Sequence, residues 1–173
     1  IEAPQRDPVR QFGSAPQVGS SPTLLVEDFL RATAAGMYDD FATARLYLQP
    51  EASATWRPNL QVAVFSSDFS PSPELKDRQG ELAQVSLSLS TVGTVNESGV
   101  LSVSVTPGSV STEFTLTLNE DGEWRIAELA DGVILSQSAF TNAYQNVKLL
   151  FPSSDLSGLV PDPRWEPRSR VAA

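Results

Sequence analysis

The stretch QVSLSLS, residues 84–90, decides the class of fold that this 173-residue chain can adopt. Its valine and two leucines alternate with serines, which is the pattern of an antiparallel strand with one apolar face and one solvated face. The same alternation recurs in four other segments, residues 62–65, 102–105, 114–118 and 124–126. Glycine-containing turn sequences lie at Asn96–Gly99 and Asn119–Gly122. The middle of the chain is therefore predicted to be a meander of four or more antiparallel strands.

Helical spacing precedes these strands. Ser21 is suited to cap a helix and Pro22 to begin it. One apolar face then follows at the helical period, formed by Leu25, Val26, Phe29 and Leu30. Gly36 is predicted to end this helix, and two shorter helical segments follow over residues 38–48 and 50–56. Helices followed by antiparallel strands indicate an α+β domain, with N-terminal helices packed on a curved antiparallel sheet. This order of elements resembles the NTF2-like (cystatin-like) cone.

The rest of the chain carries weaker signals. Residues 66–80, which contain two prolines and mixed charges, are predicted to form a loop, and residues 138–144 one or two helical turns. A short apolar strand is expected at Val147–Phe151, with Leu159–Val160 pairing back after a turn. The three prolines within residues 161–167 are expected to break regular structure.

The chain is predicted to contain one folded domain. Residues 1–22 combine four prolines with Gln, Gly, Ser and Arg and almost no apolar periodicity, so a flexible tether rich in proline and serine is expected there. Residues 23–165 are the expected α+β domain, and residues 166–173 the start of a linker.

Composition excludes several classes of function. The chain has no cysteine and no histidine, so disulfide scaffolds, thiolate metal sites and Ser-His-Asp triads are excluded. It carries 12 Lys and Arg against 21 Asp and Glu, a formal charge of −9, which argues against a nucleic-acid partner. The sequence contains neither a carboxylate cluster with metal-ligand spacing nor a glycine-rich phosphate loop. We therefore expect no metal site and no cofactor.

Three aromatic residues are candidates to line a pocket. A cone of this kind often encloses an apolar cavity between helices and sheet, and Phe29, Trp56 and Phe65 are the candidate lining residues. For Trp56 both core packing and a place at the mouth of the cone are open. A binding module for small apolar ligands is therefore one functional hypothesis.

Carboxylates and tyrosines are the nominal candidates for catalysis. An isomerase or dehydratase would need such a group with a shifted pKa inside the pocket, and Asp28, Asp40 and Tyr47 are the nominal choices. Asp39 and Asp40 are adjacent and are better explained as favourable charges at a helix N-terminus. The chain is therefore expected not to be an enzyme.

Trp165 lies beyond the last predicted strand, in the sequence PDPRW at residues 161–165. Two interpretations are open for it: it pins the tail to this domain, or it contacts a neighbouring domain. Together with Asp162 and Arg164 it is a candidate interdomain contact.

Several segments in register resemble the LpqB lipoproteins of actinobacteria. They are VEDFLRATA at residues 26–34, ATARLYLQPEASATW at 42–56, GEWRI and LADGV within 122–133, LFP at 150–152 and VPDPRW at 160–165. The chain departs from the family pattern at Tyr47, Gln49 and Ala130, where Phe, Thr and Pro are usual. The match runs in order from about residue 22 to residue 165.

This resemblance implies an organisation that composition does not. Full-length members carry a lipidated N-terminal cysteine, this domain, a GerMN-like domain and a C-terminal β-propeller. It implies a lipid anchor upstream of Ile1, a location on the outer side of the cell membrane, and a linker at residues 166–173 to a GerMN-like domain absent from this sequence. The family is associated with the extracellular part of the MtrB sensor kinase. The expectation is a non-enzymatic interaction domain that modulates MtrA–MtrB signalling.

Overall fold

The computed structural model describes residues 13–155 and 158–168. Its helices are α1 (Pro22–Ala35), the 3₁₀ helix η1 (Gly36–Tyr38), α2 (Ala42–Arg45), α3 (Pro50–Thr55) and α4 (Gln137–Ala143). Its strands are β1 (Gln61–Phe65), β2 (Glu74–Gln79), β3 (Leu82–Asn96), β4 (Leu101–Leu118), β5 (Trp124–Glu128), β6 (Val133–Ser136), β7 (Tyr144–Pro152) and β8 (Leu159–Pro167).

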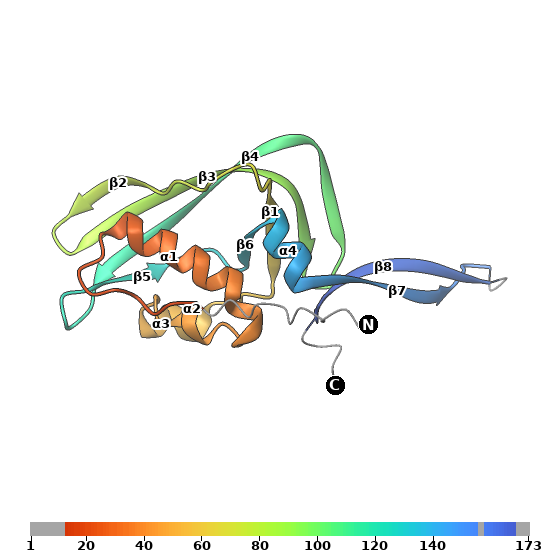
Figure 1. Ribbon diagram of the computed structural model, residues 1–173, viewed down its shortest axis with the longest axis horizontal. Coiled ribbons are helices and arrows are strands. Elements are labelled where there is room, and N and C mark those ends of the chain that lie inside the picture. Colours follow the sequence, from red (N-terminus) through yellow and green to blue (C-terminus); the bar gives the residue numbers. More distant parts are fainter. Residues whose placement is uncertain (1–12, 156–157, 169–173) are drawn as a thin grey trace, which may run out of the picture.

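Helix α1 lies beneath a curved sheet (Figure 1). The predicted cap is confirmed, because the Ser21 hydroxyl accepts a hydrogen bond from the Leu24 N–H at 3.3 Å and Pro22 is the first helical residue. The apolar face is confirmed as well: Leu25 and Val26 are fully buried. The hydrophobic effect therefore holds α1 against the strands, and the predicted α+β class is confirmed.

The sheet is mixed, which corrects the prediction of a purely antiparallel one. Six strands pair in the order β5-β4-β3-β1-β6, with β2 also paired to β3. All pairs are antiparallel except β1 with β6, which run parallel. The chain leaves β5 at one edge of the sheet and returns through residues 129–132 to the opposite edge. Strand β6 has only four residues, too few for a sequence period to distinguish it from a turn.

Strand β2 lies within the segment predicted to be a loop, so that prediction was wrong for residues 74–79. All six of its residues are exposed. The strand is held by the β3 ladder, in the register Glu74 with Ser86 to Gln79 with Leu82. A strand without buried side chains has no apolar alternation to reveal it.

Gly36 ends α1 as predicted, but for a different physical reason. Its φ is −62°, in the right-handed region, so the backbone does not require glycine there. A Cβ at Gly36 would overlap the ring of Phe41, which is only 2% exposed. Phe41 itself adopts φ +60° after Asp40 at +52°, an uncommon pair of left-handed residues. The left-handed turn at Asp40 and Phe41 therefore brings the Phe41 ring against Gly36, where only glycine leaves room for it.

Part of the segment predicted as a tether lies against the domain. Residues 1–12 are outside the described residues, but the Tyr47 hydroxyl donates to the carbonyl of Ser14 at 2.7 Å. The Gly19 N–H donates to a carboxylate oxygen of Glu123 at 2.9 Å. Tyr47 is 1% exposed, so its hydroxyl would lose its partner if this segment left the surface.

Strands β7 and β8 form a separate two-stranded hairpin that projects from the end of the domain where α4 lies (Figure 1). The predicted strand at 147–151 and its return at 159–160 are confirmed, but β8 continues through all three prolines. The ladder explains why. The Trp165 N–H points away from β7, to the carbonyl of Gly99, so every second residue of β8 has its nitrogen directed outward. Pro161, Pro163 and Pro167 occupy such positions and remove no ladder hydrogen bond.

Substitution of Gly36 by alanine tests the packing of Phe41. Replacing a glycine in the right-handed conformation by alanine ordinarily stabilises a protein by about 0.4–1 kcal/mol. Here Gly36→Ala is expected to lower the free energy of unfolding by about 1–3 kcal/mol, because the added methyl overpacks the Phe41 ring. Urea unfolding measures the change. Gly108→Ala, where an added Cβ has open space, is the control, and a stabilised Gly36→Ala protein would contradict the packing argument.

Alkaline unfolding tests the Tyr47 contact. Burial, and to a smaller extent the charge of Asp28, raises the pKa of the Tyr47 phenol above its ordinary value of 10.0. The protonated phenol is favoured in the folded state, so its contribution is complete below about pH 10 and is lost as pH rises through the folded pKa. Tyr47→Phe is expected to cost about 1 kcal/mol near neutral pH.

The stability advantage of the parent chain over Tyr47→Phe should therefore shrink as the pH rises above about 10. Tyr38→Phe is the matched control, because the Tyr38 side chain is 43% exposed. A difference in unfolding free energy that is independent of pH would show that the Tyr47 hydroxyl is not held as described.

Candidate functional site

A cavity of about 190 Å³ lies between α1 and the sheet. Helix α1 contributes Phe29, Leu30 and Thr33 to its wall, β1 contributes Ala63, and β4 contributes Thr112 and Phe114. Residues 129–134, the crossover into β6, close the remaining side. Most of these side chains are apolar, so the cavity suits an apolar group.

The three aromatic residues predicted to line one pocket occupy three different places. Phe29 lines the 190 Å³ cavity. Phe65 lines a second cavity of about 330 Å³, which it shares with Leu30 and Ile134. Trp56 is 4% exposed and lies in the core, with its ring centroid 5.6 Å from that of Phe29 and 5.8 Å from that of Phe41. The core interpretation of Trp56 therefore matches its position.

Trp56 nevertheless positions the cavity wall. Its indole N–H donates to the carbonyl of Gly132 at 3.3 Å. The neighbouring Arg57 backbone makes a reciprocal pair: its N–H donates to the Asp131 carboxylate at 2.8 Å, and its carbonyl accepts from the Gly132 N–H at 2.9 Å. Gly132 has φ +93°, and a Cβ there would overlap the carbonyl of Gln61. These contacts fix residues 131–132 against the end of α3.

Arg45 holds Trp56 from the other side. Its guanidinium lies 5.4 Å from the centre of the indole ring, a cation–π distance. It also donates to the carbonyls of Ser53 and Trp56 at the C-terminal end of α3. A cation is favoured at this end of a helix, where carbonyls lack partners within the helix. Arg45 and Trp56, two residues of one sequence motif, therefore act together to place the cavity wall.

The nominal catalytic residues lie away from this cavity. Asp28 pairs with Arg31 at 2.5 Å, and Tyr47 donates to the Ser14 carbonyl. Both line a different cavity, of about 360 Å³, beside residues 13–17. Asp40 occupies the left-handed turn before α2. The neighbouring Asp39 carboxylate accepts from the Thr43 N–H at 3.0 Å, so the predicted role of an acidic residue at that helix start is confirmed for Asp39.

The lining of the 190 Å³ cavity offers little for acid–base chemistry. Asp131 is the charged residue among its described lining residues, and its carboxylate is engaged by the Arg57 N–H. Within residues 13–155 and 158–168, no group of three or more Asp, Glu, His or Cys side chains is placed to bind a metal ion. The arrangement can hold an apolar group but does not place an acid and a base beside it.

Of the three candidate interdomain residues, Trp165 lies at the base of the hairpin, and Arg164 and Asp162 lie further along β8. Asp162 and Arg164 pair with each other at 2.5 Å, and Arg164 donates to the carbonyl of Ser98 at 3.2 Å. The Trp165 N–H donates to the Gly99 carbonyl at 2.8 Å, and its ring centroid lies 5.0 Å from that of Phe140. Gly99, at φ +80°, permits this approach, since a Cβ there would lie 2.6 Å from the Trp165 carbonyl oxygen. Trp165 thus attaches the hairpin to this domain.

Sequence reasoning missed two features. One is the cavity wall at residues 129–134, which the turn sequence Ala130-Asp131-Gly132 marked without indicating that it faces α1. The other is the exposed apolar surface of the hairpin, where Leu150 and Leu159 are 59% and 62% exposed. The apolar residues of β7 were visible in the sequence, but their exposure depends on the hairpin standing apart from the core.

No helix in the described part of the chain combines the length and the apolar composition needed to cross a membrane.

Comparison with known proteins places the chain in a family. Residues 15–141 match the family described as "Lipoprotein LpqB, N-terminal domain". The chain is 32% identical to Lipoprotein LpqB of Nocardia farcinica over 160 residues, which are 92% of this chain and 26% of that protein. It is 33% identical to Lipoprotein LpqB of Rhodococcus opacus over 161 residues (92% and 26%) and 31% identical to that of Thermobifida fusca over 162 residues (92% and 25%).

The chain spans about a quarter of the length of these curated relatives. No solved structure matches it significantly. The matched region covers well over half of the chain and includes the Arg45–Trp56 corner and the cavity wall described above. On this evidence the chain belongs to the LpqB lipoprotein family and contains its N-terminal domain.

Proposed function

We propose that this chain is a non-enzymatic interaction domain of a lipid-anchored protein on the outer side of the cell membrane. In this proposal it modulates MtrA–MtrB signalling by binding the extracellular part of an MtrB-type sensor kinase. Family membership is the observation that carries the proposal. The relatives are named lipoproteins, and in this proposal the protein that contains this chain is anchored by a lipid as well.

The contacts made by three residues of the family motifs support an interaction role. Arg45 and Trp56 fix the corner between α3 and β6, and Trp165 fixes the hairpin. These side chains maintain shape and do not converge on a reacting group. We propose further that the curved sheet over α1 is an NTF2-like cone, a fold that serves binding as readily as catalysis.

Deletion of the domain tests the proposed interaction. The longer lipoprotein without its lipid is measured against the kinase's extracellular domain by biolayer interferometry, with and without residues 1–165. Deletion is expected to weaken binding by about tenfold or more, equivalent to about 1.4 kcal/mol. The chain of residues 1–173 should also compete with the longer protein. Unchanged affinity after deletion, together with no competition, would rule out a part for this domain.

A second candidate function is supported by the cavity beneath α1. We propose as the alternative a module that binds small apolar ligands. The cavity of about 190 Å³ is lined largely by apolar side chains. An apolar cavity of about 150 Å³ is large enough for benzene, so a ligand of one aromatic ring would fit.

Filling the cavity tests this alternative. Ala63 faces the cavity from β1, so Ala63→Phe should occupy the space with a benzyl group. Saturation-transfer NMR with benzene or indole is expected to show binding to the parent chain and loss of that signal in Ala63→Phe. Ala127→Phe is the matched control, because Ala127 is half-buried in β5 and is not among the lining residues. Equal signals from the parent and Ala63→Phe would exclude the cavity as the binding site.

A further inference from the structure

The outer half of the β7–β8 hairpin exposes apolar side chains on both faces. Successive residues of a strand point to opposite faces, and residues paired across the two strands share a face. One face carries Leu149, Phe151 and Val160, which are 37%, 46% and 52% exposed. The other carries Leu150 and Leu159, which are 59% and 62% exposed. Exposed apolar side chains clustered in this way on a folded domain are typical of an interaction site.

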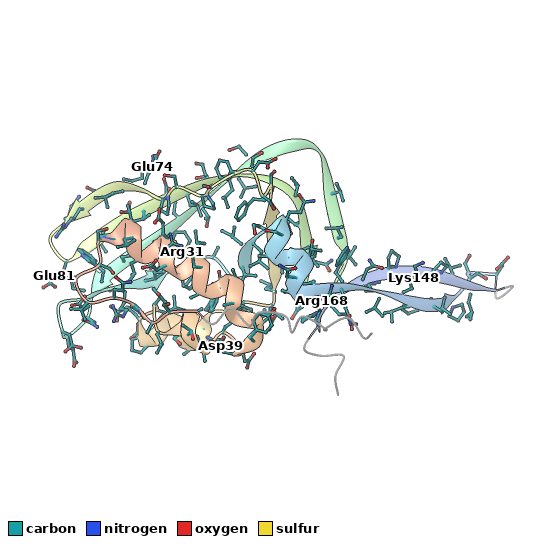
Figure 2. The ribbon with its side chains drawn as sticks, viewed as in Figure 1. Arg31, Asp39, Glu74, Glu81, Lys148 and Arg168 are labelled. Carbon is teal, nitrogen blue, oxygen red and sulfur yellow. The ribbon has the colours of Figure 1, made fainter. Side chains whose placement is uncertain are left out.

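Nothing among the described residues covers this outer half. Figure 2 shows side chains around Lys148 standing off the hairpin with no other element beside them. Among the described residues, the hairpin is attached near its base, where Tyr144 stacks on Phe140, the tilted Trp165 ring packs on Phe140, and Trp165 and Arg164 hydrogen-bond to residues 98–99. An isolated two-stranded hairpin is marginally stable in water, so a partner packed on this outer half would stabilise it.

The two edges of the hairpin are not equivalent. The Ser153 N–H donates to the carbonyl of Gly158 across the hairpin, whereas the Trp165 N–H points outward. Backbone N–H groups alternate between inward and outward along each strand, so these two contacts show which residues of β7 and β8 direct their N–H groups outward. On β8, prolines at 161 and 163 remove the outward donors, so this edge is closed to strand addition. On β7, the outward amides belong to Asn146, Lys148 and Leu150, and no described residue accepts a hydrogen bond from them. A further strand can therefore pair only with the β7 edge.

We propose that the β7 edge binds a β-strand from the polypeptide that follows this domain in the longer protein, with the apolar surfaces of the hairpin packed against the same segment. The proposal rests on the proposed function only in treating this chain as the first domain of a longer protein. The matched family is described as an N-terminal domain, and the relatives are about four times the matched length, so most of their chain follows it.

Covalent linkage favours this occupant. Strand β8 ends at Pro167, opposite Tyr144, so a segment that follows it in the longer chain starts from the base of the hairpin. Linkage gives such a segment a high effective concentration at a hairpin about 30 Å long.

Amide hydrogen exchange tests the proposal without the kinase. The chain of residues 1–173 is compared with the longer polypeptide, prepared without its lipid. Exchange of the Asn146, Lys148 and Leu150 amides is expected to be slower by about tenfold or more in the longer polypeptide. Leu150→Asp should remove this protection. Val103→Asp, at an exposed apolar position outside the hairpin, should leave it intact.

Three outcomes would overturn the proposal. Equal exchange of the three amides in both chains would mean that no following segment binds the edge. Protection that rises with protein concentration in the 173-residue chain alone would make a second copy the occupant. Protection that appears only when the kinase's extracellular domain is added would make the kinase the occupant. Because the first comparison omits the kinase, unchanged amide exchange would contradict the proposed strand pairing without bearing on kinase binding.

Discussion

The indole of Trp56 packs between Phe29 and Phe41 in the core and donates its N–H to the carbonyl of Gly132. One side chain thus joins the helical layer to the crossover that carries the chain from β5 to β6. The buried N–H requires an acceptor, and the acceptor lies on a segment that could otherwise take several positions. Arg45, whose guanidinium lies over the Trp56 ring, donates to the carbonyls at the end of α3. The contacts of this corner hold residues 131–132 of the cavity wall, directly before β6.

Trp165 attaches the hairpin to the domain by the same two kinds of interaction, aromatic packing and a hydrogen bond to a backbone carbonyl. An aromatic ring packs on Phe140 while backbone hydrogen bonding to Gly99 places the strand. It differs in what lies beyond it. The Trp56 corner is surrounded by core, whereas the hairpin beyond Trp165 continues into solvent with its apolar residues uncovered. The domain therefore combines a packed core with a projecting hairpin, β7–β8, that exposes apolar side chains.

Local signals predicted much of the fold because they act over a few residues. The Ser21 cap, the apolar face of α1, the alternation in β3 and the turns before β4 and β5 depend on neighbours in sequence. The elements that were missed are held by distant partners. Strand β2 has no buried side chain and exists only through the β3 ladder, and β6 is four residues long. The candidate pocket shows the same limit: Phe29 lines the cavity and Phe65 a different one, while residues 129–134 reach it only through the crossover.

The sequence by itself determined the class of the domain, its helical start, its strand-rich middle and the absence of cysteine and histidine chemistry. It also carried the motifs that place the chain in its family. The tertiary structure decided what those motifs do. Trp56 and Gly132 are far apart in sequence, as are Gly99 and Trp165, and their roles appear only when the corner and the hairpin base bring them together. The prolines of β8 make the same point. A proline is disfavoured wherever its nitrogen faces a neighbouring strand, and only the register of the pair shows which way each nitrogen faces.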